Sequence, residues 1–135
     1  MEAKELRIGN IVADKDNDIF ELSGFYLYQL SIEQNTKGII TSHKPIILTE
    51  EWLLKLGFEP IYDYYKIQIQ KDDGGGNSDY FISVDTGMDN ESNEFTIQLV
   101  SGEGDWFTSK NKYVHQLQNL YFALTGEELT IKIKE

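Results

Sequence analysis

One tripeptide of this sequence, Asp85-Thr86-Gly87, matches a motif with catalytic use. Aspartic proteases place a catalytic carboxylate in this motif after an apolar strand, and a small chain would pair two copies so that the carboxylates share a proton. Here the preceding Ile82-Ser83-Val84 is only half apolar, and Met88 stands where a small residue is usual. Because Asp-Thr-Gly is also ordinary turn chemistry, a dimeric aspartic protease that uses Asp85 is a remote alternative.

Acidic side chains at two places resemble parts of a cation site. Asp14, Asp16 and Asp18 have the spacing that opens an EF-hand calcium loop. Such a loop has Gly at its sixth position and Glu at its twelfth, where this chain has Ile19 and Phe25. We therefore expect solvated acids rather than a metal site there, and the same for a looser acidic group formed by Asp85, Asp89, Glu91 and Glu94.

The remaining residues with catalytic potential lack their usual partners. Gly74-Gly75-Gly76 has no Lys-Ser/Thr after it, and no Gly-x-Ser-x-Gly elbow exists. The chain has no cysteine, which excludes thiol chemistry, and its two histidines cannot form a three-histidine zinc site. For His115 we favour a capping or hydrogen-bonding role over a general base, and we interpret His43 as a surface residue. A non-enzymatic role without a cofactor is favoured over an enzyme, whether the protease or a hydrolase with an unseen metal.

Aromatic residues are the remaining candidates for binding. Four tyrosines between positions 62 and 80 can form an exposed platform, and a Trp-Phe pair precedes the last expected helix. Exposed Tyr and Trp are common anchors of protein interfaces. In the competing interpretation, the Trp-Phe pair packs over the start of that helix. The candidate binding residues are Tyr62, Tyr64, Trp106 and Phe107.

The chain is strongly acidic, with 12 Lys and Arg, 23 Asp and Glu, and a net charge of -11 over 135 residues. Nine acids and no base lie between Asp72 and Asp105. Such a surface argues against direct binding of nucleic acid, whose phosphates need cations, and against an anionic membrane. Solubility is the simplest role of this charge. The alternative is an acidic inhibitor that mimics DNA and occupies a nucleic-acid-binding protein.

The first 60 residues favour short strands followed by a helix. Strands are expected at 6–13 and 19–27, the latter with Gly24 at a bulge, and shorter strands at 28–34 and 38–42. This spacing predicts a small barrel or a strongly bent sheet. The opening resembles SH3-like barrels, whose first strand often carries a Gly before an apolar pair, so we expect an SH3-like small β-barrel. A connecting helix follows, with Thr49 as N-cap and Gly57 at its end. Trp52 of this helix is expected in the core.

Residues 61–135 predict an antiparallel sheet packed by one helix. Tyr65, Ile67 and Ile69 alternate with polar residues, which is typical of a strand with one buried face. The expected elements are strands at 64–70, 79–84, 95–100 and 129–133, and a helix from 111 to 124 that stops at Gly126. The fold class is therefore α+β, with parts 1–60 and 61–135 that form one compact unit.

Three segments resemble a family of small bacterial proteins of unknown function that are often associated with phage-like or mobile genetic elements. They are ELRIGN at 5–10, ILTEEWLLKLGF at 47–58 and YVHQLQNLYFALTGEEL at 113–129. The resemblance implies an accessory protein and assigns no catalytic residue. No apolar run suggests a secretory signal or a membrane span. Because no catalytic constellation is present and tyrosine is in surplus, we expect a cytoplasmic protein-interaction module whose partner is another protein.

Overall fold

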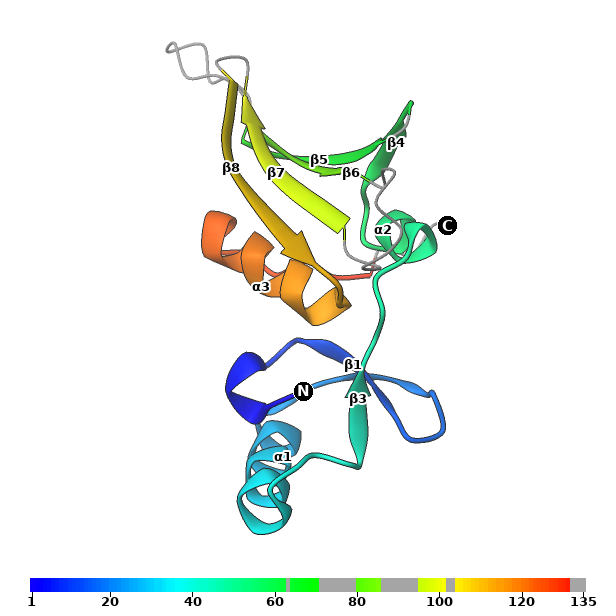
Figure 1. Ribbon diagram of the computed structural model, residues 1–135, viewed down its shortest axis with the longest axis vertical. Helices are drawn as coiled ribbons and strands as arrows, with labels where there is room; N and C mark the ends of the chain where they lie inside the picture. The colour runs from blue at the N-terminus through cyan, green and yellow to red at the C-terminus, as the bar shows by residue number, and fades with distance from the viewer. Residues whose placement is uncertain (63, 71–79, 86–94, 102–103, 132–135) are drawn as a thin grey trace. The chain divides into compact units, whose positions relative to one another are not determined.

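A computed structural model describes residues 1–62, 64–70, 80–85, 95–101 and 104–131, without the side chains of 70, 101 and 104–109 (Figure 1). These residues form an α+β fold with two antiparallel sheets. The contacts divide the chain into two units, Met1–Ile47 with Tyr113–Leu129 and Leu48–Lys112 with Thr130–Glu135. This division differs from the boundary expected near residue 60, because the last helix groups with the N-terminal segment.

The first unit has a three-stranded antiparallel sheet in the order β2-β1-β3. A buried cluster lies between this sheet and the first α-helix and includes Leu6, Val12, Leu22, Leu30 and Ile40. Burial of a side chain such as that of Leu30 contributes about 2 kcal/mol. The elements are η1 (Ala3–Glu5), β1 (Ile11–Asp14), β2 (Ile19–Glu21), α1 (Gly24–Lys37), β3 (His43–Pro45) and α3 (Val114–Thr125).

Helix α1 occupies residues for which the sequence predicted strands. The Oγ of Ser23 accepts a hydrogen bond from the backbone N–H of Tyr26 and caps the helix start. Gly38, at φ 79°, closes the helix in the left-handed conformation. The strands expected at 28–34 and in the second half of 19–27 are therefore wrong, and Gly24 is the first helical residue rather than a bulge. No strand forms at 38–42 either.

The three strands in residues 1–62 form a sheet, and no closed barrel is present in this described range, so the SH3-like barrel is not confirmed.

Helix α3 contacts β1 within the first unit. The Oδ1 atom of Asn119 accepts hydrogen bonds from Arg7 Nε at 3.0 Å and from Asn10 Nδ2 at 2.8 Å. The helix ends at Gly126, which has a φ of 74°, as the sequence predicted. It begins at Val114, a few residues later than expected. Residues 129–131 are not a strand, and the rest of the strand expected at 129–133 lies outside the described residues.

The second unit is a five-stranded antiparallel meander in the order β4-β5-β6-β7-β8. Cross-strand pairs align Tyr65 with Val84 and Val84 with Ile97, so these three residues share one face of the sheet. This register confirms the alternation expected in the three central strands except at Ile69, where the pairing of β5 with β6 shifts between Gln68 and Gln70. The elements are α2 (Glu50–Lys55), β4 (Glu59–Ile61), β5 (Tyr64–Gln70), β6 (Tyr80–Asp85), β7 (Phe95–Ser101) and β8 (Gly104–Asn111).

Helix α2 agrees with its sequence signals. The Oγ1 of Thr49 accepts a hydrogen bond from the backbone N–H of Trp52, and Gly57 adopts a φ of 96° just after the helix. Trp52 is buried, as expected, and Lys55 Nζ lies 4.9 Å from the centre of its ring. Of the helices in the described residues, none has the length and apolar character that a membrane span requires.

Candidate binding surface on helix α1

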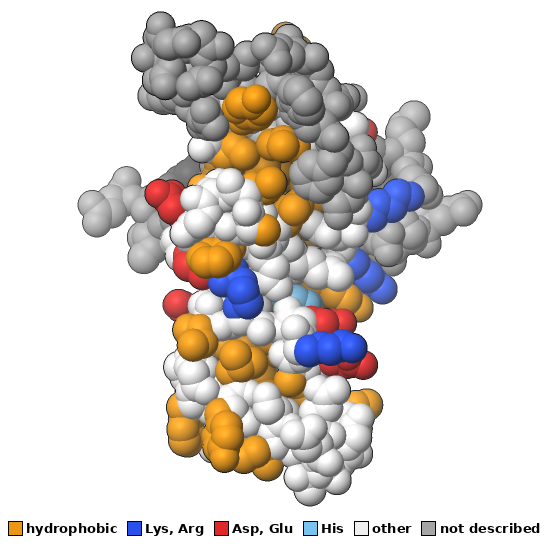
Figure 2. Space-filling model, turned by 90° about the vertical axis from the view of Figure 1, so that its left-hand side faces the viewer, with side chains coloured by type: hydrophobic (Ala, Val, Ile, Leu, Met, Phe, Trp, Pro, Cys, Tyr) orange, Lys and Arg blue, Asp and Glu red, His pale blue; other side chains and the backbone are white. Residues whose placement is uncertain are grey.

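Helix α1 exposes a row of large hydrophobic side chains. Phe25 is 64% exposed, Tyr28 65% and Ile32 46%. Because they are spaced by three and four residues, they lie on one face of the helix. Hydrophobic side chains gather on the lower part of the surface in Figure 2. This is the part of the molecule that contains α1 (Figure 1). Adjacent exposed apolar side chains of this size make this helix face a candidate interaction site.

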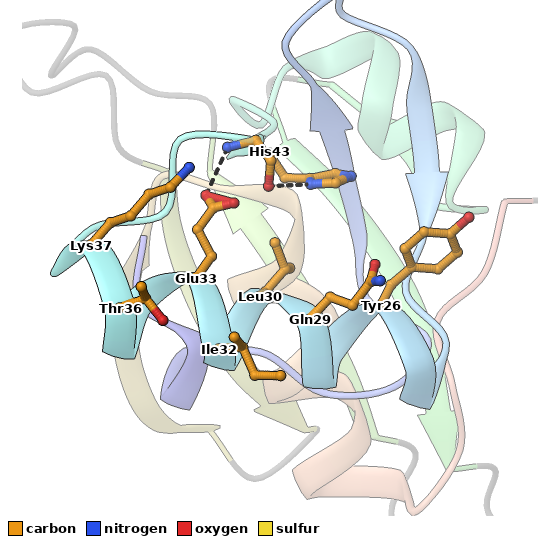
Figure 3. A pocket seen from close by; sticks show the side chains of 9 residues that line it. Tyr26, Gln29, Leu30, Ile32, Glu33, Thr36, Lys37 and His43 are labelled. Carbon is orange, nitrogen blue, oxygen red and sulfur yellow. Dashed lines mark hydrogen bonds between the residues drawn. The ribbon is translucent and has the colours of Figure 1, made fainter.

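A pocket of about 500 Å³ adjoins this row. Tyr26, Leu30 and Ile32 provide its apolar lining, and Glu33 and His43 are among its polar groups (Figure 3). Ile32 belongs both to the exposed row and to the pocket. The row and the pocket therefore form one continuous surface, which we call the α1 surface.

The Glu33 carboxylate holds the chain that returns from α1 to β3. Its Oε1 atom accepts hydrogen bonds from the backbone N–H groups of Thr41 and Ser42, the latter at 2.9 Å. The bond from Ser42 and then that from Thr41 lower the pKa of Glu33 from 4.5 to about 2. Glu33 is therefore ionised under all ordinary conditions and presents a fixed negative charge at the pocket.

Ring contacts fix the aromatic side of the pocket. The ring centres of Phe20 and Tyr26 are 4.5 Å apart in an edge-to-face contact, and those of Phe20 and His43 are 5.3 Å apart. His43 Nδ1 also lies 3.0 Å from the Oγ of Ser42. His43 is half-buried in β3 rather than a surface residue in a connection. The pocket wall is thus held by neighbouring side chains before any ligand arrives.

The tyrosines chosen from the sequence lie at one edge of the five-stranded sheet. Tyr62 is fully exposed in the turn between β4 and β5, at a φ of 54°, and Tyr64 is the half-buried first residue of β5. Trp106 and Phe107 lie on β8, at the opposite edge. Three strand spacings, about 14 Å, separate β5 from β8. The backbone positions therefore keep the tyrosines and the Trp-Phe pair as two separate groups on different strands.

The Trp-Phe pair precedes the last helix as part of a strand that the sequence did not predict. Phe107 pairs with Leu99, and Asp105 pairs with Val100, so Trp106 falls at a register shift. The side chains of both aromatic residues lie outside the described part of the molecule. The prediction that they bind a partner is therefore neither supported nor opposed.

The candidate catalytic and metal residues form no site within the described ranges. Asp85 is the exposed last residue of β6, and the other two residues of its motif lie outside those ranges. The Oδ1 of Asp14 accepts hydrogen bonds from the N–H groups of Asp16 and Asp18, and these bonds form a turn. Among the described residues, no group of three or more His, Asp or Glu is placed to hold a metal ion. Gly74-Gly75-Gly76 and the group of acids from Asp89 onward lie outside these residues.

His115 is buried in the first unit. Its Nδ1 atom has no hydrogen-bond partner among the described residues, and its Nε2 atom lies 4.0 Å from Glu5 Oε2. Burial lowers the pKa of His115 below 6.5, and the charge of Glu5 opposes this shift. The imidazole is therefore a neutral, packed ring at pH 7, stacked on Tyr113 with ring centres 5.8 Å apart.

Sequence reasoning missed the α1 surface, although a signal for it was present. Ser23 and Gly38 are good helix boundaries, and the three exposed hydrophobic residues have helical spacing between them. Comparisons of the chain with protein-family models, curated proteins and solved structures found no match. The resemblance to mobile-element proteins thus stays a prediction, and the geometry of the α1 surface is what supports a function.

Proposed function

We propose that this protein is a non-enzymatic interaction module that binds another protein through the α1 surface. The observation that carries the proposal is the exposed row of Phe25, Tyr28 and Ile32 on one helix face. Large aromatic side chains supply much of the binding energy of protein interfaces. The expected role as a cytoplasmic accessory protein is compatible with this function and is part of the proposal.

The helix is well suited to present these side chains in a fixed arrangement. Leu30, on its other side, is buried in the core, and Leu27 packs against the same cluster. Ser23 and Gly38 cap its two ends. A surface that is already ordered loses less conformational entropy on binding, so a partner gains more from each contact.

The test is a pull-down with the tagged full chain from nuclease-treated lysate of the native host, washed at low and at high salt. We expect the wild type to retain one partner at high salt, and the double variant F25S/Y28S to lose it. The matched control is Y62S/Y64S, which removes two aromatic side chains from the other unit and should retain the partner. Thermal unfolding of each variant checks that the fold is intact.

Two results would contradict the proposal. One is that F25S/Y28S, still folded, retains the partner as well as the wild type does. The other is that no protein is retained at either salt concentration. If Y62S/Y64S alone loses the partner, the binding site is the tyrosine edge of the five-stranded sheet instead.

A second candidate function is supported by the distribution of charge. Nine acids and no base lie between Asp72 and Asp105, a pattern that suits an inhibitor imitating the DNA backbone. Seven of the nine lie outside the described residues. Such a complex depends on charge, so it should dissociate at high salt. A nucleic-acid-binding partner that is lost at high salt and is unaffected by F25S/Y28S would favour this candidate.

A further inference from the structure

The pocket of the α1 surface combines an apolar lining with the Glu33 carboxylate. The backbone N–H groups of Thr41 and Ser42 donate to the Oε1 atom of Glu33. Lys37 lines the same pocket, and its charge, like the Ser42 side chain, helps to hold the pKa of Glu33 low, although no ion pair within 4.0 Å joins Lys37 to Glu33 among the described contacts. The backbone hydrogen bonds leave the Oε2 atom as the oxygen that a cation from outside the chain can approach. Figure 3 shows the Glu33 side chain rising from α1 between Leu30 and Lys37.

The overall charge points to the same kind of partner. At a net charge of -11, the chain attracts cationic segments and repels acidic ones. The exposed row beside the pocket is itself uncharged, since it consists of Phe25, Tyr28 and Ile32. A fitting partner segment is therefore apolar where it meets the helix and positive where it meets Glu33.

We infer that the pocket binds a partner segment in which a large apolar side chain lies next to a Lys or Arg. The apolar side chain packs between Tyr26, Leu30 and Ile32, and the cationic group binds Glu33 Oε2. This inference rests on the proposed function and adds the chemistry of the partner to it. Flanking apolar residues of the same segment cover Phe25 and Tyr28.

Two other occupants fit less well. A small molecule confined to the pocket would leave Phe25 and Tyr28 uncovered, although Ile32 connects them to the pocket. A second copy of the chain would bring together two molecules that each carry a charge of -11. A peptide segment of a basic partner covers the whole surface without that repulsion.

The experiment begins with a random dodecapeptide phage library selected on the immobilised full chain. We expect the enriched peptides to share a large apolar residue adjacent to Lys or Arg. The best peptide is then synthesised with a fluorescein label, together with one copy in which the basic residue is Gln and one in which the apolar residue is Ala. Fluorescence anisotropy gives the affinity of each peptide for the wild type and the variants.

The informative variant is E33Q, because a Gln oxygen can still accept the N–H groups of Thr41 and Ser42 while the charge is lost. We expect E33Q to weaken binding of the parent peptide about three- to fivefold, which corresponds to the usual energy of a partly exposed ion pair. Replacing the basic residue of the peptide should weaken binding to the wild type by the same factor and leave binding to E33Q unchanged. Such a cycle isolates the pair from other effects of each substitution.

The outcomes separate this inference from the proposed function. Enriched peptides that need Phe25 and Tyr28 but carry no basic residue, or that bind E33Q as well as the wild type, would overturn the inference and leave the interaction module intact. A lack of enrichment, or binding that F25S/Y28S does not affect, would overturn the inference and count against the module. A dimer that forms in sedimentation experiments and is abolished by F25S/Y28S would assign the surface to a second copy and also overturn the inference.

Discussion

Gln118, on helix α3, accepts a hydrogen bond of 2.8 Å from the backbone N–H of Ile11, the first residue of β1. Its Nε2 atom donates to the carbonyl oxygens of Gly9 at 3.1 Å and Leu129 at 3.0 Å. Gln118 is completely buried, and its bonds to Ile11 and Leu129 are buried with it, so water cannot replace these two. One side chain thus satisfies three backbone groups, from the segment before β1, the start of β1 and the segment after α3.

Replacement of Gln118 by Leu is expected to destabilise the protein. Leu fills a similar volume, but it leaves the N–H of Ile11 and the carbonyl of Leu129 buried without their bonds to Gln118, and the half-buried carbonyl of Gly9 also loses its bond. Each buried group costs about 1–3 kcal/mol, so we expect a loss of at least about 2 kcal/mol in the free energy of unfolding. Urea unfolding measures it, with Q29L on the exposed side of α1 as control. A loss below 1 kcal/mol, about the value of an exposed hydrogen bond, would show that Gln118 is not needed.

Arg7 should not be replaceable by Lys without loss. Its Nη1 lies 2.7 Å from Glu128 Oε1, its Nε donates to Asn119, and its guanidinium lies 4.1 Å from the centre of the Phe122 ring. A Lys ammonium keeps the charge but lacks the planar fork that makes these contacts together. We expect R7K to lower the unfolding free energy by about 1 kcal/mol. Thermal unfolding checks this, and K4R, at an exposed position of η1, should change nothing. If R7K has the same melting temperature as the wild type, the planar guanidinium of Arg7 is not needed for stability.

The sequence allowed prediction of those elements that local chemistry determines. Thr49 caps α2 and Gly126 ends α3, because a side-chain acceptor and a residue tolerant of positive φ act within one helical turn. The alternation around Ile67 and Ile82 places both on one sheet face, since side chains on a strand alternate. Each of these features is decided by residues close together in the chain.

The errors came from residues whose propensity and actual environment disagree. Phe25, Tyr28 and Ile32 are aromatic or β-branched, so they suggested strands, but the capped helix α1 contains them. Strand β8 was missed because its second half, 108–111, is Thr-Ser-Lys-Asn and shows no apolar alternation. Strand β8 forms because it pairs with β7. A pairing with a neighbouring strand cannot be recognised from a local sequence pattern.

The candidate site was less predictable than the fold. An exposed row on a helix face can be recognised only after the segment is assigned to a helix. The pocket further depends on the return of Ser42 and His43 to α1, which the hydrogen bond to Glu33 establishes. Tyr62 illustrates the opposite case, since the sequence predicted its exposure correctly.

His115 is expected to make stability depend on pH near neutrality. Burial lowers its pKa in the folded protein below 6.5, with the Met1 amino group adding to the shift and Glu5 opposing it. As the pH falls through 6.5, the unfolded chain takes up a proton before the folded protein does, so the unfolding free energy decreases. Urea unfolding between about pH 7.5 and 5 should show this decrease, and H115F should reduce it.

The same variant provides a control at higher pH. Phe occupies a similar space and removes the buried Nδ1 that has no described partner, so at pH 7.5 H115F should be within about 1 kcal/mol of the wild type. An unchanged pH slope in H115F would assign the titration to another group. E5Q should steepen the slope, because it removes the charge that favours the protonated imidazole.

Glu33 is expected to contribute to loss of stability in acid. Its pKa is about 2 in the folded protein against an ordinary value of 4.5, so between these values the unfolded chain takes up a proton that the folded protein does not. The stabilisation is complete above pH 4.5 and is lost as the pH falls towards 2. E33Q should therefore lose less unfolding free energy than the wild type in this window, measured by urea unfolding. If E33Q and the wild type have parallel profiles, the carboxylate does not hold the loop at Thr41 and Ser42 in solution, and the fixed charge assigned to the pocket would be wrong.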